Sequence, residues 1–276
     1  MTTQTAQRTM TQLREHYEIE KELANRLRRA ATSSERRRLY SVVYDERLQR
    51  IPHHPLLTQA QNSQTRMAAV IPQLRLLQPF LTRSTVFLEI GPGDCALAVE
   101  VAKQVKQVYA VDVSDGLVQA GARPANFALY LSDGIQVPAP ANSSHLAYSN
   151  QLMEHLHPED AHEQLLGIHR TLVPGGRYIC VTPNRLSGPW DISRHFDHFA
   201  TGLHLKEYTI AELADTFRAA GFRQVRVFIS YGGHHLSPQL PVLPFRWLEW
   251  GLERLPHTQG RKIAHGLTAV KVIATK

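Results

Sequence analysis

Three histidines in the second half of the chain have side chains suited to acid–base chemistry. His155 lies in a stretch, Glu154 to Asp160, that is crowded with titratable groups. Histidine titrates near neutral pH, so it can take a proton from a phenol or another hydroxyl group as that oxygen attacks an electrophile. We predict His155 as the first candidate for a general base, His204 as the second and His198 as a third. The alternative is that His155 only packs against, or caps, the helix that follows it.

A second group of residues has the types and spacing of a nucleotide-binding turn. Val86 to Ile90 is a short apolar run, Gly91 and Gly93 follow at once, and a helical pattern begins at Ala96. Glycine has no Cβ, so a ligand can lie against the backbone of such a turn, and the helix beyond it starts with free N–H groups. A dinucleotide fingerprint would have a third glycine where Ala96 stands, and its absence speaks against NAD.

Carboxylates occur near this turn and at the ends of the next two apolar runs. Glu89 stands two residues before the first glycine, and Asp112 ends the run Gln107 to Val111. A carboxylate at Asp112 could accept hydrogen bonds from both hydroxyl groups of a ribose. Asp133 and Gly134 follow the third run, although an Asp-Gly pair also occurs in turns for conformational reasons alone.

These motifs resemble those of the class I S-adenosylmethionine-dependent methyltransferases. The first motif of that family is an acidic residue, any residue and a glycine-rich turn, and the match here is Glu89-Ile-Gly-Pro-Gly93. Four further motifs follow in order with suitable gaps: Asp112, Leu131-Ser-Asp-Gly-Ile135, Tyr148-Ser-Asn-Gln-Leu-Met-Glu-His155 and Leu172-Val-Pro-Gly-Gly176. The resemblance covers residues from near 80 to near 230 and a final strand.

The resemblance implies S-adenosyl-L-methionine as the cofactor and a set of residues that bind it. Glu89 is expected to contact the amino acid end of the cofactor, and Gly91 and Gly93 the adjoining chain. Asp112 is expected to contact the ribose, and the adenine is expected to contact Asp133, Gly134 and Ile135. Val113 and Asn150 complete the set of expected binding residues.

The predicted reaction is transfer of a methyl group to a small-molecule acceptor. We favour an oxygen nucleophile, because histidine-assisted deprotonation of a hydroxyl suits the available residues. The alternatives are a methyltransferase for RNA or another polyanion, a non-catalytic cofactor-binding protein, and an NAD-dependent oxidoreductase. A net charge of +7 favours a polyanion. The lack of a recognisable RNA-binding module disfavours it.

The sequence predicts no metal site. The two cysteines, Cys95 and Cys180, have no metal-ligand spacing, and the stretch from His162 to Leu166 lacks the second histidine of the zinc-protease motif. The adjacent pairs at 53–54 and 234–235 complete no tetrahedral set at a recognisable spacing.

The elements that must position these residues are those of an α/β fold. We expect a Rossmann-like, doubly wound, mostly parallel sheet of seven strands with an N-terminal helical cap. Residues 1–80 form the cap, which either closes over the site as a lid or only covers the sheet. Residues 81–276 form the cofactor-binding domain, with an insertion at about 231–266 that packs on the sheet, lines the acceptor site, forms a dimer contact or meets a membrane surface. The family topology would place the last strand, Thr268 to Thr275, antiparallel between the fifth and sixth strands.

The composition is that of an ordinary globular protein, with 43% hydrophobic and 20% charged residues. The first residues contain no apolar core of a signal peptide, and no apolar run is long enough to span a bilayer. We therefore expect a cytoplasmic protein without a transmembrane segment. The sequence does not indicate an oligomeric state.

Overall fold

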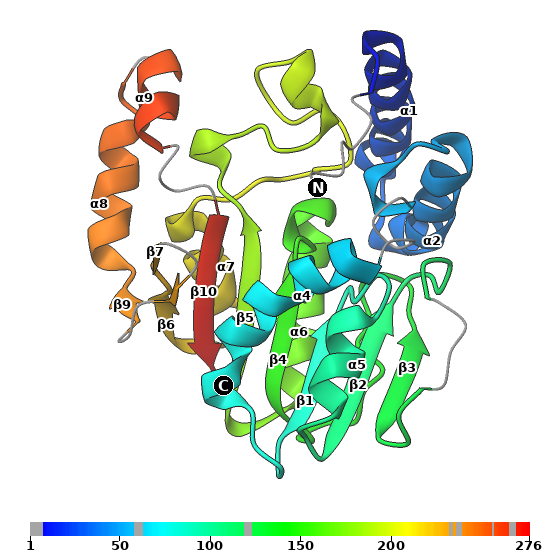
Figure 1. Ribbon diagram of the computed structural model, residues 1–276. Helices are drawn as coiled ribbons and strands as arrows, with labels where there is room; N and C mark the ends of the chain where they lie inside the picture. Colours follow the sequence, from blue (N-terminus) through cyan, green and yellow to red (C-terminus); the bar gives the residue numbers. More distant parts are fainter. Residues whose placement is uncertain are drawn as a thin grey trace.

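The computed structural model describes residues 8–57, 63–118, 123–231, 234–235, 239–255, 257–264 and 269–276. A central sheet carries helices on both faces, and two N-terminal helices lie at the end toward which the parallel strands point (Figure 1). The α-helices are α1 (Met10–Arg29), α2 (Ser33–Arg50), α4 (Ser63–Leu77), α5 (Ala96–Ala102), α6 (Pro158–Thr171), α7 (Ile210–Ala219), α8 (Leu243–Leu252) and α9 (His257–Ala264).

The large sheet has eight strands in the order β3-β2-β1-β4-β5-β10-β6-β9. Its strands are β1 (Val86–Ile90), β2 (Gln107–Asp112), β3 (Phe127–Leu131), β4 (Ser144–Asn150), β5 (Leu172–Pro183), β6 (Arg223–Val227), β9 (Leu240–Pro241) and β10 (Ala269–Thr275), while β7 (Ser230–Tyr231) and β8 (His234–His235) form a separate pair. Strands β1 to β5 are parallel, and β10 pairs antiparallel with both β5 and β6.

The structure confirms the expected α/β class, the mostly parallel sheet and the place of the last strand. The expected number of strands, seven, was one too few, because β9 comes from inside the expected insertion and pairs with β6 through Arg226 and Val227. A strand of two residues has too little apolar pattern to be seen in a sequence. Thr268, the expected first residue of the last strand, lies outside the described residues.

The central strand β1 is buried at all five positions because both faces of a parallel sheet are covered by helices. Phe87 points into the core on the α4 and α5 face, and Leu88 and Ile90 point into the core on the face of α1, α2, α6 and α7. The glycine turn that follows β1 is therefore fixed by packing on both sides of the sheet.

Helix α2 is held against the sheet domain by a buried ion pair. The guanidinium of Arg36 donates to Asp160 of α6 at 2.6 and 2.8 Å, and the hydroxyl of Tyr40 donates to the same carboxylate at 2.7 Å. Arg36 and Asp160 are both fully buried. This connection fixes one side of α2 over the end of the sheet.

The expected insertion contains helix α8, which packs on α7. Glu249 of α8 is buried and accepts hydrogen bonds from the backbone N–H groups of Ile210 and Ala211 at 2.6 and 2.9 Å, so it satisfies the first turn of α7. The opposite face of α8 leaves Trp247 and Trp250 at least half exposed. Packing on the sheet domain is thus one role of this segment.

In the described part of the chain, no helix combines the length and the apolar character needed to cross a membrane.

Candidate active site

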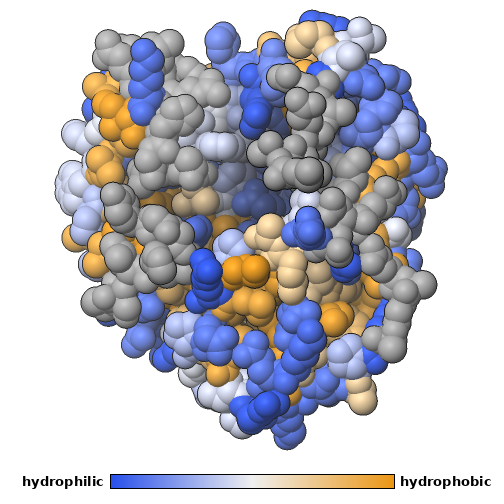
Figure 2. All heavy atoms as spheres, viewed as in Figure 1, coloured by the Kyte–Doolittle hydropathy of each residue, from blue (hydrophilic) through white to orange (hydrophobic). Residues whose placement is uncertain are grey.

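A cavity of about 450 Å³ lies at the carboxyl ends of β1, β2 and β4, between the sheet and the helices α2 and α4. We call it the first cavity. Figure 2 shows the molecule hollowed near the middle of one face, with hydrophilic side chains deep in the hollow. Of the residues predicted to bind a cofactor, those that line the first cavity are Glu89, Gly91, Gly93, Asp112, Val113, Gly134 and Asn150. Parallel strands bring these residues together, because their carboxyl ends meet at one edge of the sheet.

The glycine turn after β1 needs its glycines for conformation and for space. Gly91 and Gly93 have φ of +68° and +58°, in the left-handed region that other residues rarely adopt. A Cβ on Gly91 would stand 3.0 Å from Leu152, which also lines the first cavity. The turn therefore presents bare backbone to the cavity.

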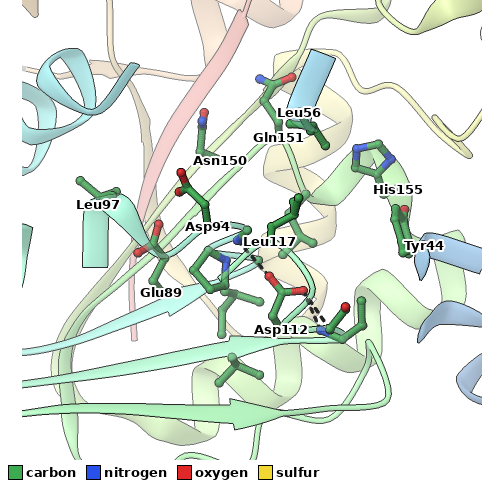
Figure 3. Close-up of a pocket in the computed structure, with 18 of the residues that line it drawn as sticks. Tyr44, Leu56, Glu89, Asp94, Leu97, Asp112, Leu117, Asn150, Gln151 and His155 are labelled. Atoms are coloured by element: carbon green, nitrogen blue, oxygen red, sulfur yellow. Dashed lines mark hydrogen bonds between the residues drawn. The ribbon is translucent and has the colours of Figure 1, made fainter. Parts of the chain in front are cut away.

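Asp112, at the end of β2, fixes this turn from the neighbouring strand. Its carboxylate accepts a hydrogen bond from the N–H of Gly93 at 3.0 Å and another from the N–H of Val113 at 2.7 Å (Figure 3). Burial raises the pKa of Asp112, while these backbone N–H groups counteract the shift. Oδ1 also accepts a longer hydrogen bond from the N–H of Ser114 at 3.4 Å, whereas Oδ2 keeps a second lone pair that can accept a hydroxyl group of a ribose.

Glu89, near the end of β1, has an unsatisfied oxygen. The residue is 5% exposed, and its Oε2 has no hydrogen-bond partner among the described residues. Burial, together with the negative charges of Asp94 and Asp112, raises the pKa of Glu89 to about 8. A buried acceptor without a partner is costly. The amino acid end of S-adenosylmethionine carries an ammonium group that would satisfy this oxygen, so Glu89 fits the predicted cofactor.

The residues predicted to surround the adenine lie only partly in the first cavity. Gly134 lines it, but Asp133 and Ile135 are not among its lining residues. The Asp133 carboxylate accepts a hydrogen bond from Arg37 of α2 at 2.8 Å and others from the N–H groups of Ile135 and Gln136. Ile135 is 1% exposed and belongs to the core. A contact between Asp133 and adenine remains a prediction. Arg37 already donates a hydrogen bond to the Asp133 carboxylate, so it would compete with the adenine for this acceptor.

His155 lies on the opposite side of the first cavity from Glu89 (Figure 3). Its Nδ1 is 3.0 Å from the carbonyl oxygen of Leu203. A carbonyl oxygen can only accept, so Nδ1 carries the hydrogen and Nε2 keeps its lone pair. Burial, with smaller effects from His204 and Arg47, lowers the pKa of His155 to about 3. His155 is therefore neutral at physiological pH.

A second cavity of about 310 Å³ adjoins the first, and the two have Arg47 and His155 as common lining residues. His204 and His195 line this second cavity, whereas His198 lines a different one on the far side of His204. The Nδ1 of His204 is 2.7 Å from a carboxylate oxygen of Glu207. Burial lowers the pKa of His204, but the hydrogen bond to Glu207 and the charge of Glu154 raise it by more, so the net shift is upward.

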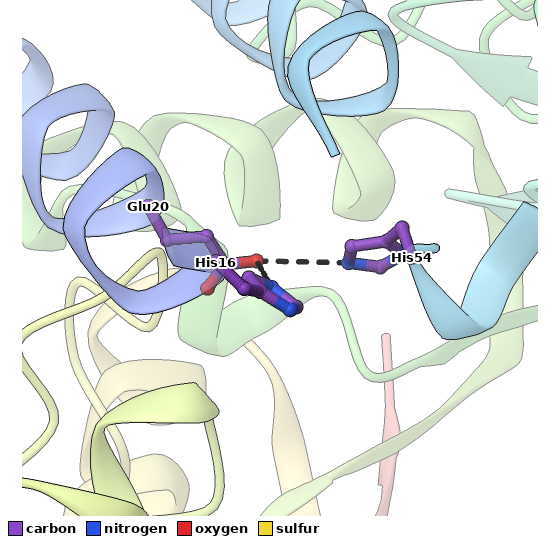
Figure 4. Close-up of side chains that lie close together, drawn as sticks. All are labelled: His16, Glu20 and His54. Atoms are coloured by element: carbon purple, nitrogen blue, oxygen red, sulfur yellow. Dashed lines mark hydrogen bonds and ion pairs between the residues drawn. The ribbon is translucent and has the colours of Figure 1, made fainter. Parts of the chain in front are cut away.

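The polar residues of the second cavity that were not predicted as site residues include His16 and Glu20 of α1, and His54 after α2. All three are buried. Figure 4 shows both imidazole rings turned toward one carboxylate oxygen of Glu20, at 3.0 Å from His16 Nε2 and 3.6 Å from His54 Nε2. The sequence did contain a signal, since His16 and Glu20 are four residues apart and lie among the buried apolar positions of an amphipathic helix.

A family model matches the part of the chain that contains the five sequence motifs. Residues 88–180, from β1 to β5, match the methyltransferase domain family. The chain carries a class I S-adenosylmethionine-dependent methyltransferase domain. The cofactor of this methyltransferase is therefore S-adenosylmethionine, and the protein is an enzyme. No curated protein sequence matches the chain significantly.

Solved structures share the fold of this methyltransferase at low sequence identity. A chain of the complex between the Haloferax volcanii Trm112 methyltransferase activator and a methyltransferase matches at 16% identity and a TM-score of 0.53, over 80% of this chain and 97% of that one. A methyltransferase from Archaeoglobus fulgidus matches at 19% identity and a TM-score of 0.52, over 76% of this chain and 94% of that one. A third match is phosphoethanolamine N-methyltransferase 1 of Haemonchus contortus, solved with phosphoethanolamine and S-adenosylhomocysteine. Its sequence identity is 17% and its TM-score 0.51, over 67% of this chain and 40% of that one.

Proposed function

We propose that this methyltransferase binds its cofactor in the first cavity and methylates an oxygen of a small molecule held in the second cavity. The observation that carries this proposal is that the two cavities adjoin, with His155 lining both. An acceptor and a methyl donor in adjacent cavities meet at that shared wall. Holding two reactants in this way removes much of the entropic barrier of a bimolecular reaction.

In the first cavity, each predicted binding residue has a distinct role. Glu89 would accept a hydrogen bond from the cofactor's ammonium group, which satisfies its unpartnered Oε2. Asp112 would hold the ribose while it anchors the turn that contains Gly91 and Gly93. Gly134 would lie against the adenine, with Asp133 and Ile135 behind it, and Val113 and Asn150 would complete the wall.

The chemistry at the shared wall is a displacement at carbon. When bound, the cofactor supplies a methyl group on a sulfonium sulfur, and this sulfur leaves as a neutral thioether when an acceptor oxygen bonds to the methyl carbon. His155 presents the lone pair of Nε2, because its Nδ1–H is donated to Leu203. That lone pair can accept a hydrogen bond from an acceptor hydroxyl, which orients its oxygen, and can take the hydroxyl proton as the bond from oxygen to the methyl carbon forms. His204 lies next to His155, with ring centroids 5.0 Å apart, and borders the acceptor's cavity.

A small acceptor suits the size and lining of the second cavity. Its volume of about 310 Å³ is in the range of sites for small ligands. Arginines, histidines and two carboxylates line it, so the acceptor we expect is polar. We also propose that the enzyme works in the cytoplasm, which cell fractionation of the source organism would test.

Calorimetric titration with S-adenosylhomocysteine, and separately with NADH, tests the cofactor site. We expect the first ligand to bind at micromolar Kd, about −8 kcal/mol, and the second not to bind. Asp112→Ala should abolish the binding, since it removes the expected ribose contact and frees the glycine turn. Asp115→Ala is the matched control, because Asp115 is exposed three residues away and does not line the first cavity.

Two results would overturn the assignment. Tighter binding of NADH than of S-adenosylhomocysteine would reject the proposed cofactor site. Unchanged affinity in Asp112→Ala would place the cofactor elsewhere. Release of S-adenosylhomocysteine from S-adenosylmethionine in the presence of hydroxylated small molecules would then identify the acceptor, and its failure with every acceptor would favour a non-catalytic binding protein.

A further inference from the structure

Two clusters of histidine and carboxylate side chains have the composition of a metal site, and in each the two histidines line the second cavity. They are His16, Glu20 and His54, and Glu154, His155 and His204. Within each cluster, one potential ligand atom per residue lies within 4.8 Å of the others. Two histidines and one carboxylate form a common set of protein ligands for Zn²⁺ or Fe²⁺ in sites that keep a position open for substrate. The hydrogen bonds around the histidines distinguish the two clusters.

In the cluster of His16, Glu20 and His54, the hydrogen bonds oppose metal binding. Arg8 donates to His16 Nδ1 at 2.7 Å, and the backbone N–H of Leu56 donates to His54 Nδ1 at 3.2 Å. Both Nδ1 atoms are therefore acceptors, which leaves the hydrogen of each neutral ring on Nε2, facing Glu20. A metal ion at Nε2 would need a ring that has lost both hydrogens. This cluster is better described as a carboxylate held by two imidazole N–H groups (Figure 4).

In the cluster of Glu154, His155 and His204, the hydrogen bonds are of the opposite kind. His155 donates its Nδ1–H to the carbonyl of Leu203 at 3.0 Å, and His204 donates its Nδ1–H to Glu207 at 2.7 Å. When the rings are neutral, the Nε2 of each is then left with a lone pair. Metal-binding histidines almost always donate their other ring N–H to a carbonyl or a carboxylate in this way.

Glu154 supplies an independent indication. The side chain is fully buried, and the hydroxyl of Thr182 donates to its Oε2 at 2.8 Å. Its Oε1 has no hydrogen-bond partner among the described residues. A buried carboxylate oxygen without a partner among the described residues, next to two imidazole rings, is a place where a bound cation would be stabilised.

We propose that Glu154, His155 and His204 bind one divalent transition-metal ion, with Zn²⁺ or Fe²⁺ as the best match, on the wall of the second cavity. In a tetrahedral site, ligand atoms at about 2.0–2.2 Å from one ion are about 3.3–3.6 Å apart, so atoms that lie within 4.8 Å of one another need to approach by at most about 1.5 Å. Three protein ligands leave a position for a ligand from the cavity, which His155 and His204 both line.

The role of this ion rests on the proposed function. An acceptor hydroxyl in the second cavity would take the open position, where the ion lowers the pKa of the hydroxyl and fixes its oxygen beside the first cavity. His155 would then orient the acceptor oxygen through the ion instead of by a direct hydrogen bond.

Metal content is the direct test. Tag-free protein is loaded separately with Zn²⁺, Fe²⁺ under argon, Mn²⁺ and Mg²⁺, desalted and measured by mass spectrometry of the elements. We expect one Zn²⁺ or Fe²⁺ per chain and no retained Mg²⁺. Co²⁺-loaded protein should show the visible ligand-field absorption of a site with nitrogen ligands.

Variants separate the two clusters. Glu154→Gln and His204→Gln should each weaken Zn²⁺ binding at least 100-fold, whereas His54→Gln should retain it. Loss of the ion in His54→Gln but not in His204→Gln would assign it to the other cluster and overturn the proposal. Wild-type protein that retains no transition metal would also overturn it, even if a variant fails to fold.

Titration of the same samples with S-adenosylhomocysteine separates this inference from the proposed function. Binding of S-adenosylhomocysteine without any retained metal would reject the metal site alone. Retained metal without such binding would reject the cofactor site alone. His204→Gln should bind S-adenosylhomocysteine like wild type, because His204 does not line the first cavity.

Discussion

Two carboxylates at neighbouring strand ends of the first cavity differ in how they are satisfied. The carboxylate of Asp112 accepts hydrogen bonds from backbone N–H groups on both oxygens, whereas Glu89 has a buried oxygen that finds no partner in the described part of the chain. The carboxylate of Asp112 therefore has hydrogen-bond donors before a ligand binds, whereas the buried oxygen of Glu89 gains a donor only when the ligand binds. This difference gives Glu89 a measurable signature in cofactor binding.

We expect binding of S-adenosylhomocysteine to release a proton near pH 7. The pKa of Glu89 is raised to about 8 by burial and by Asp94 and Asp112, so its carboxyl is protonated below that pH. The ammonium of the ligand favours the carboxylate, so affinity should rise with pH, by up to about tenfold per unit, until it levels off near pH 8. Calorimetry at pH 7 in buffers of different ionisation enthalpy measures the proton count.

The same titration in Glu89→Gln provides the control for this prediction. Besides Asp94 and Asp112, the groups whose charges interact with Glu89 are the Cys95 thiol and the Tyr148 phenol, and the pKa of each is raised by burial, so both stay neutral near pH 7. The variant should bind more weakly and release no proton. A proton release that persists in Glu89→Gln would assign the titration to another group.

The sequence could indicate the residues of the first cavity because strand ends and glycine turns are local patterns. Glu89, Gly91, Gly93 and Asp112 each stand at a fixed place relative to an apolar run, and the parallel sheet then assembles them. The ion pair of Asp133 with Arg37 joins residues far apart in the chain, so no local sequence pattern predicts it. The same is true of the contact between His54 and Glu20, and of the acceptors that set the tautomers of His155 and His204.

At the scale of the elements, α2 connects α1 to the sheet and its helices. Its Arg36 is paired with Asp160 in the interior, while its Arg50 pairs with Glu22 and Glu46 near the surface. Glu46 lies in α2 itself, whereas the pairs with Asp160 and Glu22 join α2 to α6 and α1 in very different surroundings. Their contributions to stability should differ accordingly.

Arg36→Ala should lower the free energy of unfolding by about 3–5 kcal/mol, since it leaves the buried Asp160 without its positive partner. Arg50→Ala should cost about 1 kcal/mol or less, because its ion pairs are partly exposed. Urea denaturation of both variants and of wild type measures the difference. Equal losses in the two variants would mean that the Asp160 carboxylate is satisfied by Tyr40 and needs no positive charge.

The N-terminal helices either close over the cofactor or only cover the sheet. Tyr40, Tyr44 and Leu48 of α2 line the first cavity, so a mobile α2 would be held in place by a bound cofactor. We expect S-adenosylhomocysteine to slow amide hydrogen exchange in α2 at least tenfold more than in α6. Equal slowing in both helices would reveal only global stabilisation, and α2 would then be a static cover.

Elements with long periodic patterns could be predicted from the sequence, and short ones could not. Helices α1 and α2, strands β1 to β6 and the antiparallel β10 occur in the expected order. Strand β5 begins at Leu172, so it includes the motif Leu172-Val-Pro-Gly-Gly176, and its pairing with β4 shifts register between Leu172 and Arg177. The division of the chain into a cap of residues 1–80 and a domain of residues 81–276 remains a prediction.

For the whole molecule, cofactor binding is expected to raise thermal stability. S-adenosylhomocysteine at 100 times its Kd should stabilise the native state by about 2.7 kcal/mol, which corresponds to an increase in Tm of about 5–10 °C for a chain of this size. Differential scanning calorimetry measures it. Asp112→Ala should show no increase, and an equal increase with NADH would contradict the proposed cofactor site.

The same experiment bears on the positive net charge of +7. If the enzyme methylated RNA, a short RNA should also raise the Tm, and the effect should fall steeply as salt is added, because phosphate contacts release counterions. We expect no such salt-dependent increase, since the proposed acceptor is a small molecule.

The place of β10 between β5 and β6 has a consequence for synthesis on the ribosome. Strand β5 ends at Pro183 and β6 at Val227, but β10, which joins them, starts only at Ala269. While the nascent chain grows, the facing edges of β5 and β6 have no strand between them, and unpaired strand edges invite association with other chains. Ribosome-bound chains that end before Ala269 should therefore bind chaperones, and release should follow emergence of β10.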